Sequence, residues 1–510
     1  MIEALVLSLA VTAYGVPGTG TITIDERGRF VRRFDAGPAS EGEGWDGRNA
    51  WRSDATGMPR VQGDPAERAE ILGWSHALRN ALEAGKTHAL VTSSQDSVDI
   101  TFAGARRSLG VLVPRTITAR SAGNGTWTVT VIAARRVADS PALFALPRPP
   151  RDASLSGTIT TVPLTLRGNE ATVTARINGV PLSVYTDTGG QNVVTESAAR
   201  RIGLHVVGGG SVAGGGGTAT IRYAWANSVR AGNAVMTHQP FIVLPDSAMP
   251  GTAAGIIGYE LFARFAARFD ARAGTLSLAR TPAAFGPAVQ TVPFGFVDRQ
   301  PEVMGSLDGV PGAISLDTGS TFTGQVTASF VAQHQLVRML HARVTAIGQG
   351  VGGRYPLYLV RAHSLTLGTV TVDDPLLALL TRPGVWNAGG PIINLGFAML
   401  RRWIFVLDYP NRTIQLRPGG DPSGNLIRDR SGLQIALRGA SVDVVSVLAG
   451  TPAAEAGITE GLHLRYLNGR RLNKADLAWA QTQLHGQAGT PVTLRFTNGV
   501  QRTIVLRRYL

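Results

Sequence analysis

The chain has 510 residues, 44% apolar and 16% charged, which excludes a disordered protein and exceeds what one ordinary hydrophobic core organises. Its formal net charge is +14, but the basic residues are scattered arginines, with lysine only at Lys86 and Lys474, so we expect no nucleic-acid partner. The absence of cysteine excludes disulfides, cysteine–zinc sites and thiol catalysis. Abundant glycine and few aromatic residues favour a β-rich chain with many turns.

An apolar run, ALVLSLAVTAY at 4–14, begins the chain. It is too short to span a bilayer and is similar to the apolar core of a secretory signal, although Glu3 stands where such signals carry basic residues. We therefore predict a truncated signal segment over 1–14 and a periplasmic or secreted protein. The alternative is a buried first strand. We expect no integral membrane span, because no other segment is apolar over the length that a spanning helix requires.

Residues 15–144 are predicted to form a β-rich accessory domain. Polar and apolar residues alternate over 20–34 and 126–137, as in half-buried strands, and the stretch 65–85 has the pattern of one helix. The sequence GWDGRNAWRSD at 44–54 resembles half-barrel periplasmic proteins related to lipoprotein carriers. This resemblance implies lipid or peptide binding, or a spacer role.

Two stretches predict linkers, because they combine proline, glycine and charge without periodicity. They are ALPRPPRDAS at 145–154 and RPGGDPSGN at 417–425. The block between them contains an internal repeat: NGVPLSVYTDTGG at 178–190 is echoed by DGVPGAISLDTGS at 308–320. A second pair of similar segments, 256–278 and 394–416, lies further along each copy. Two copies of one half-domain imply a pseudo-twofold arrangement.

Each copy places an aspartate where an apolar strand runs into a glycine turn, at Asp187 and Asp317. A carboxylate at the end of a buried strand is costly unless it is paired, exposed or chemically used. The structural alternative is a pair of duplicated turns in which each aspartate caps its own loop. That alternative does not account for the shared flanking frame.

The paired Asp-Thr-Gly motifs resemble aspartic proteases of the pepsin and retroviral-protease superfamily, over about half of the chain. The resemblance implies a bilobal β-fold in which Asp187 and Asp317 are the catalytic pair of one monomeric chain. Two adjacent carboxyl groups share one proton, activate a water and protonate the scissile carbonyl. This chemistry needs no cofactor, no metal and no covalent intermediate, and polypeptides are the expected substrates.

The resemblance also assigns supporting roles around the pair. Thr188 and Thr318 are expected to hydrogen-bond across the two lobes, and Gly189 and Gly319 to permit a tight turn beneath the acids. The residue after each motif differs between the copies, Gly190 in the first and Ser320 in the second. We expect the Ser320 hydroxyl to reach back to Asp317, which would make Asp317 the ionised member and leave the shared proton on Asp187.

Glycine-rich runs follow each motif at 208–217 and 348–353. They are predicted to be two flap hairpins that close over a peptide, and the alternative is a pair of surface loops. The second run also fits a dinucleotide-binding pattern, but Tyr355-Pro356 follows it in place of a helix. The residues that mark these flaps and the turns behind the site are Gly208, Gly217, Gly348, Gly353, Gly258 and Gly396.

The C-terminal part resembles a PDZ domain of the kind appended to bacterial proteases, on VVSVLAGTPAAEAGITEG at 444–461 and LNGRRL at 467–472. SGLQI at 431–435 would be its carboxylate-binding loop, with a helix near 475–485 as the other wall of a groove for C-terminal peptides. The loop residues concerned are Gly432, Leu433 and Ile435. Leu462 departs from the pattern, which usually has aspartate there.

The predicted fold is thus mainly β, with a bilobal centre, a half-barrel-like N-terminal domain carrying one helix, and a PDZ-like C-terminal domain. The predicted bounds are 1–14 for the signal segment, 15–144 for the accessory domain, 155–285 and 286–418 for the two lobes, and 430–510 for the PDZ-like domain. The leading interpretation is an aspartic endopeptidase. A catalytically impaired peptide-binding protein of the same fold is the alternative, and an adaptor that sequesters an apolar ligand is a third hypothesis.

Overall fold

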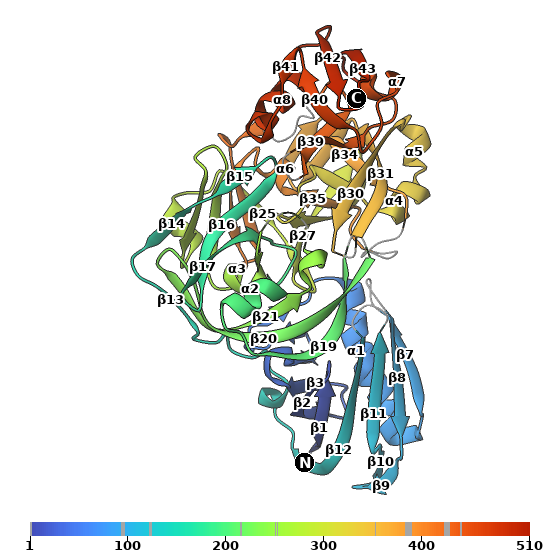
Figure 1. Ribbon diagram of the computed structural model, residues 1–510. Helices are drawn as coiled ribbons and strands as arrows, with labels where there is room; N and C mark the ends of the chain where they lie inside the picture. Colours follow the sequence, from blue (N-terminus) through green and yellow to red (C-terminus); the bar gives the residue numbers. More distant parts are fainter. Residues whose placement is uncertain are drawn as a thin grey trace.

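A ten-stranded antiparallel sheet forms the N-terminal part of the computed structural model (Figure 1). The structure describes residues 3–92, 97–121, 125–214, 217–249, 251, 253–351, 353–382, 390–422, 429–438 and 441–509. In sheet order the strands are β6 Pro59–Val61, β5 Ala50–Ser53, β4 Glu41–Trp45, β3 Phe30–Asp35, β2 Val16–Ile24, β1 Glu3–Ala13, β12 Gly125–Ala138, β11 Thr116–Ser121, β8 Ser97–Ala103 and β7 His88–Thr92. A separate hairpin joins β9 Arg106–Ser108 to β10 Val111–Val113.

The helix α1 Pro65–Ala84 packs on this sheet, as the sequence pattern predicts. Asp64 caps its first turn by accepting from the Ala66 and Glu67 N–H groups, and Gly85 ends it in the left-handed region with φ of 65°. Short 3-10 turns lie at Gly37–Ala39 and Pro141–Leu143. A mainly β domain with one α-helix is therefore present at the N-terminal end.

Residues 3–13, which lie within the predicted signal segment, form a strand in this structure. Residues Glu3–Ala13 form β1, which pairs with β2 on one side and β12 on the other, and its apolar side chains are buried in the sheet core. The alternating apolar pattern here belongs to a central strand, which is the alternative stated above. The predicted location, periplasmic or secreted, loses this support and remains a prediction.

The centre of the molecule consists of two lobes with the same strand connectivity. The lobe 1 strands, in sheet order, are β13 Ala153–Leu155, β21 Ala234–Leu244, β18 Val193–Thr195, β22 Gly255–Ile257, β17 Val180–Thr186, β16 Glu170–Ile177, β20 Gly217–Ala231 and β19 Val206–Gly214, with β15 Thr165–Arg167 beside β16. The lobe 2 strands are β30 Val344–Gly350, β31 Gly353–Arg361, β34 Leu376–Leu380, β29 Gly324–Val326, β35 Ile393–Gly396, β28 Val310–Asp317, β27 Gln300–Leu307, β32 Ser364–Leu367 and β33 Val370–Asp373, with β26 Gly295–Val297 beside β27.

Short helices accompany the corresponding strands of the two lobes. In lobe 1 they are α2 Glu196–Arg201 and α3 Tyr259–Phe262, with 3-10 turns at Asp246–Ala248 and Pro282–Phe285. In lobe 2 they are α4 Ala328–Gln333, α5 Leu336–Met339 and α6 Phe397–Leu400.

A third sheet joins the lobes and lies on the pseudo-twofold axis. Each lobe gives it three strands, in the order β14 Ile159–Pro163, β24 Thr275–Ala279, β23 Ala266–Asp270, β36 Ile404–Asp408, β37 Thr413–Arg417 and β25 Gln290–Pro293. The two repeat copies meet where β23 pairs with β36, and Phe269 stacks on Phe405 with ring centroids 4.6 Å apart. The duplicated segments at 256–278 and 394–416 thus build one shared core.

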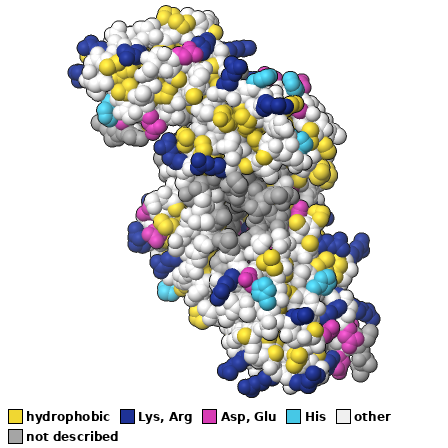
Figure 2. Space-filling model, turned by 90° about the vertical axis from the view of Figure 1, so that its right-hand side faces the viewer, with side chains coloured by type: hydrophobic (Ala, Val, Ile, Leu, Met, Phe, Trp, Pro, Cys, Tyr) yellow, Lys and Arg dark blue, Asp and Glu magenta, His cyan; other side chains and the backbone are white. Residues whose placement is uncertain are grey.

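The C-terminal part is a smaller sheet of β38 Leu433–Arg438, β39 Ser441–Val447, β40 His463–Leu467, β42 Pro491–Phe496 and β43 Gln501–Val505, with β41 Arg470–Arg471 beside β40. The helices are α7 Pro452–Glu455 and α8 Leu477–Leu484, after a 3-10 turn at Lys474–Asp476. Leu448 and Tyr509 pack on apolar residues of β30 and β31. No helix among the described residues is long and apolar enough to cross a membrane. On the face in Figure 2 the Lys and Arg side chains are spread over the whole length of the molecule.

Candidate active site

Both aspartates of the repeated motif lie at the ends of buried central strands. Asp187 follows β17, and Asp317 is the last residue of β28. Each strand runs parallel to the strand that begins the second repeated segment, β22 and β35 respectively. The pairing fixes the backbone of each acid; for example, the Asp187 N–H donates to the Ile257 carbonyl at 3.0 Å. The same connectivity in both lobes brings the two acids to the axis.

The carboxyl groups of Asp187 and Asp317 are close enough to influence each other's pKa, and a Cβ on Gly319, two residues after Asp317, would lie 2.5 Å from Cγ of Asp187. Oδ1 of Asp187 also accepts from the Gly189 N–H at 2.8 Å, and Oδ1 of Asp317 accepts from the Gly319 N–H at 2.9 Å and the Ser320 N–H at 3.0 Å. The carboxylates therefore face each other while their own turns hold them from below. This contact is the arrangement that the resemblance implied, and the loop-capping alternative does not require it.

Thr188 and Thr318 connect the two lobes beneath the acids. The Thr188 N–H donates to Oγ1 of Thr318 at 3.1 Å, and the Thr318 N–H donates to Oγ1 of Thr188 at 2.9 Å. Each hydroxyl then donates to a carbonyl of the opposite lobe, at Leu316 and Thr186, at 2.9 and 2.7 Å. Four reciprocal bonds between buried groups thus hold the acids at one separation.

Close approach requires a glycine in the second motif and less strictly in the first. A Cβ on Gly319 would lie 2.5 Å from Cγ of Asp187, so Gly319 makes room for the carboxyl group of the other lobe. A Cβ on Gly189 would lie 3.1 Å from Nε2 of Gln300 and in ordinary contact, at 3.4 Å, with Cγ of Asp317. The sequence interpretation assigned these glycines to a tight turn, but neither residue has a positive φ. A Cβ on Gly190 would lie 2.8 Å from Oδ2 of Asp187, so a serine there would crowd that carboxyl group.

Asn394 is a functional residue that the sequence analysis missed. Its Nδ2 donates to Oδ2 of Asp317 at 2.7 Å, while its Oδ1 accepts from Nε2 of Gln300 at 3.0 Å and from Oγ of Ser315 at 2.9 Å. These two donors fix the amide with its NH2 group toward the carboxylate. The sequence does contain a signal for this residue. Asn394 lies two residues before the turn glycine Gly396, and the equivalent position before Gly258 in the first copy is the apolar Ile256.

The expected contact of the Ser320 hydroxyl with Asp317 is not made. Its Oγ faces Oε1 of Gln325 at 3.4 Å, and only the Ser320 backbone N–H reaches Asp317. Nε2 of Gln325 in turn donates to the hydroxyl of Tyr355, a residue of β31, at 2.7 Å. Asn394 occupies the position of side-chain donor that the sequence analysis gave to Ser320.

The environments of the two acids are unequal. Burial and the neighbouring carboxyl group of Asp317 raise the pKa of Asp187 well above its ordinary value. Burial also raises the pKa of Asp317, but the Asn394 amide and two backbone N–H groups oppose that rise. The pKa of Asp187 is therefore raised further than that of Asp317. That Asp187 holds the shared proton remains a prediction, with Asn394 in place of Ser320 as the side-chain donor to Asp317.

Two hairpins occupy the positions predicted for flaps. The lobe 1 hairpin is β19 with β20, and the lobe 2 hairpin is β30 with β31. Their tips are in contact, because a Cβ on Gly214 would lie 2.5 Å from Cβ of Val351. The four glycines named for the flaps lie on these hairpins. Gly208, Gly217 and Gly353 have positive φ angles, and the Tyr355 ring packs against Gly348.

The two turn glycines lie directly behind the acids. A Cβ on Gly258 would lie 2.4 Å from the Gly190 carbonyl oxygen, and one on Gly396 would lie 2.0 Å from the Phe322 carbonyl oxygen. The residues that follow them, Tyr259 and Phe397, donate their N–H groups to the carbonyls of Gly190 and Ser320. No side chain fits there without moving the turns that carry the acids.

The predicted carboxylate-binding loop of the C-terminal part is already occupied. The N–H groups of Ser431 and Gly432 donate to Asp429 at 2.8 and 2.9 Å, and the Leu433 N–H donates to Oγ of Ser431 at 3.1 Å. The Tyr509 hydroxyl donates to the same Asp429 carboxylate at 3.0 Å. The N–H groups of this loop therefore bind the carboxylate of Asp429, which belongs to the same chain. Ile435 lies beyond the loop, on β38.

Loss of one threonine hydroxyl from the lobe connection should weaken the fold. Thr318→Val removes the acceptor of the Thr188 N–H and the donor to Thr186, which leaves two buried polar groups without partners. We expect the free energy of unfolding to fall by about 2–4 kcal/mol. Denaturant titration measures this change. Thr291→Val, on the exposed side of β25, is the matched control and should change it by less than about 0.5 kcal/mol; equal losses in both variants would contradict the role of the connection.

Comparison with known proteins agrees with the first lobe. Residues 173–261 match the family model described as aspartyl protease, a segment that carries Asp187. A carboxy-terminal-processing protease of Bartonella bacilliformis is 31% identical over 77 residues, which is 15% of this chain and 18% of that protein, so the chain matches less than a fifth of that relative's length.

Two solved structures are similar in part. An aspartic proteinase from Irpex lacteus shares 15% identity, covers 52% of this chain and 98% of its own, and has a TM-score of 0.36. A retropepsin-like aspartic protease from Rickettsia conorii shares 21% identity, covers 25% of this chain and 92% of its own, and has a TM-score of 0.19.

Proposed function

We propose that the aspartyl-protease domain of this chain is an active aspartic endopeptidase that hydrolyses polypeptides. The observation that carries the proposal is the adjacent pair Asp187 and Asp317, joined from below by Thr188 and Thr318. Both acids come from one chain, so a monomer contains the complete pair. The hairpins whose tips meet over the lobes supply a cover for a bound peptide.

The mechanism follows from the unequal acids. A water lodged between the carboxyl groups loses a proton to ionised Asp317 and attacks the scissile carbonyl carbon, while protonated Asp187 donates its proton to the carbonyl oxygen. The tetrahedral intermediate then collapses: the C–N bond breaks, the leaving nitrogen takes the proton from Asp317, and Asp187 recovers its own from the hydroxyl group. Asn394 stabilises the charge on Asp317 before the attack.

Digestion of a denatured protein mixture, with and without a statine-type inhibitor, tests this function. The inhibitor carries a hydroxyl group that takes the place of the attacked carbonyl between the acids. New termini that appear only in the sample without inhibitor support the proposal. A digest that the inhibitor leaves unchanged contradicts it.

The alternative of a catalytically impaired peptide-binding protein rested on Gly190. Gly190 lacks a hydroxyl, but Asp187 still accepts from the Gly189 and Gly190 N–H groups. The missing hydroxyl therefore leaves the backbone donors of this acid in place. We retain the active enzyme as the proposal.

We further propose that the C-terminal part acts as a PDZ-like tether for polypeptides, with the Asp429 carboxylate as an internal competitor for its loop. A peptide's terminal carboxylate must replace Asp429 at the Ser431 and Gly432 N–H groups. The edge strand β38 and α8 form the two walls along which the peptide would lie.

Asp429→Ala should increase the affinity of the chain for C-terminal peptides, about tenfold or more, because the loop N–H groups lose their internal acceptor. Fluorescence anisotropy with a labelled library of peptides with free C-termini measures the change, and the same peptides with amidated C-termini are the control. A variant that binds free and amidated peptides alike would exclude the tether. Truncation of the whole part is a poorer test, because Leu448 and Tyr509 pack on the lobe 2 hairpin.

A further inference from the structure

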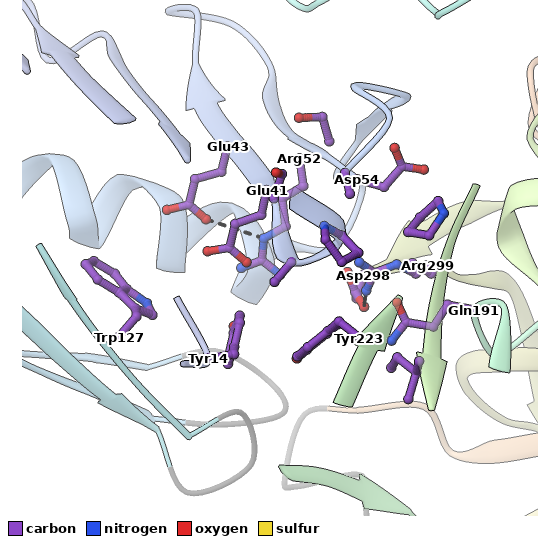
Figure 3. A pocket seen from close by; sticks show the side chains of 18 of the residues that line it. Tyr14, Glu41, Glu43, Arg52, Asp54, Trp127, Gln191, Tyr223, Asp298 and Arg299 are labelled. Atoms are coloured by element: carbon purple, nitrogen blue, oxygen red, sulfur yellow. Dashed lines mark hydrogen bonds and ion pairs between the residues drawn. The ribbon is translucent and has the colours of Figure 1, made fainter. Parts of the chain in front are cut away.

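A cavity of about 240 Å³ lies between the N-terminal domain and lobe 1. It is smaller than the roughly 300–1,000 Å³ of sites that enclose drug-sized ligands, and its size suits one side chain. Figure 3 shows Tyr14, Glu41 and Glu43 on the N-terminal side, with Tyr223 and Gln191 opposite. The cavity belongs neither to the paired acids nor to the C-terminal loop.

One wall of the cavity continues from the turn that carries Asp187. Gly190 borders the Asp187 carboxyl group, and the next two residues, Gln191 and Asn192, line the cavity wall. Ser211 and Val212, on strand β19 of the lobe 1 hairpin, line the same wall. The cavity wall therefore shares strand β19 and the segment after Gly190 with the site of the paired acids.

The N-terminal domain closes the cavity and is bound firmly to the protease lobes. The buried Arg60 side chain donates to the Asp298 carboxylate and carbonyl, both at 2.8 Å. The Gly209 N–H of the lobe 1 hairpin donates to the Tyr14 carbonyl at 2.7 Å, and the rings of Tyr14 and Tyr223 lie 5.6 Å apart. The domain thus supplies a wall in contact with one hairpin.

Acidic side chains exceed basic ones on the N-terminal wall. Five carboxylates face three guanidinium groups there, and the eight residues are Glu41, Glu43, Asp54, Glu67, Glu70, Arg32, Arg52 and Arg60. Arg32 divides its contacts between Glu41 and Glu43, at 3.3 Å from each, and its guanidinium group lies 4.6 Å from the centroids of both the Trp74 and Trp127 rings, which stack on each other. Burial raises the pKa of Glu43 and brings that of Glu67 to about 7, as expected for carboxylates with too little positive charge nearby.

Several buried polar atoms of the lining have no hydrogen-bond partner within the described part of the chain. They include the acceptor Oδ2 of Asp54 and the donors Nε and Nη1 of Arg32, Nη1 of Arg60 and Nδ2 of Asn192. Oε1 of Glu43 accepts no hydrogen bond but is ion-paired with Arg32 at 3.3 Å. These residues are at least nine-tenths buried. A peptide with a basic side chain carries both complements: cationic N–H groups for the carboxylates and carbonyl oxygens for the donors.

Glu41 is the carboxylate best placed to receive a cation. Its side chain is 32% exposed, whereas that of Glu43 is 5% exposed, so a ligand reaches Glu41 first. Its negative charge is the largest influence that raises the pKa of Tyr14, and it also acts on Tyr223. A cavity lined by a carboxylate and by aromatic rings can bind ammonium and guanidinium groups by charge and by cation–π contact.

We propose that this cavity is a substrate subsite contributed by the N-terminal domain, which takes a lysine or arginine side chain of the polypeptide with Glu41 as its counter-ion. The proposal rests on the proposed peptidase function and adds a substrate class to it. Preference for a basic residue then belongs to the N-terminal domain and not to the paired acids.

Fluorogenic peptides that differ only by lysine, methionine or glutamate at one scanned position test the subsite. We expect the wild-type chain to cleave one lysine peptide at least about tenfold faster, as kcat/KM, than its methionine counterpart. Glu41→Gln should remove that difference without slowing the methionine peptide. Glu83→Gln, an exposed acid of α1, is the matched control and should keep the difference.

Glu41→Lys provides a second variant, and it should transfer the preference from the lysine to the glutamate peptide. Equal cleavage of the lysine and methionine peptides by the wild type at every position would overturn the subsite. An equal fall in kcat/KM for both peptides in Glu41→Gln would also overturn it. Binding of the same peptides to Asp187→Asn, measured by anisotropy, separates the two hypotheses. Lysine-selective binding without wild-type cleavage would overturn only the peptidase function, and unselective binding would overturn the subsite.

Discussion

Asp187→Asn and Asp317→Asn should each lower kcat/KM for peptide hydrolysis by about a thousandfold or more. Asparagine nearly preserves the shape of each side chain but removes the proton that Asp187 donates or the base that Asp317 provides. Because the acids share one proton, neither is expected to act alone. A fluorogenic peptide assay against the wild-type chain measures the loss.

The same variants should fold as well as the wild type. Burial raises the pKa of both acids, so keeping a charge on the pair at neutral pH costs stability, and that cost falls as the pH falls. An amide avoids the cost, so we expect a Tm equal to or above that of the wild type near pH 7. Hydrolysis near the wild-type rate in a folded variant would rule out the catalytic assignment. A lower Tm in both variants would instead point to a structural role for the acids.

Asn394→Leu should move the acid limb of the kcat/KM profile to higher pH. The amide donates to the ionised form of Asp317 and so lowers the pKa of that group; without the donor, Asp317 takes up its proton at a higher pH. At a fixed pH on the acid limb, kcat/KM should fall about tenfold. Leucine has a similar volume, and Ile256 holds the equivalent position in lobe 1.

Ser320→Ala is the matched control for Asn394. Its hydroxyl faces Gln325 and not Asp317, while its backbone N–H contact is unaffected by the substitution. The acid limb should therefore stay where it is in Ser320→Ala. A shift in the alanine variant with none in the leucine variant would show that the serine, and not the asparagine, tunes the pair.

The sequence by itself determined the repeat and hence the two acids. The equal spacing from Gly179 to Asp187 and from Gly309 to Asp317 is a local property of two similar segments, and it predicts equal strand and turn geometry in both copies. The sequence also predicts helix α1, because its cap residues and its apolar face lie within one continuous stretch.

Tertiary structure decided the contacts that join distant segments. Asn394 reaches Asp317 from a strand that comes 77 residues later, and no local pattern tells which carboxylate an amide will meet. Gly319 is explained only by the opposite carboxyl group, that of Asp187, since its own φ angle would permit a side chain. Residues 4–14 show the same limit: an apolar run of that length fits a signal or a strand, and pairing with β2 and β12 decides for the strand. The cavity beside Glu41 exists because two parts of the chain with different hydrophobic cores meet, so its charge depends on residues that are distant in the sequence.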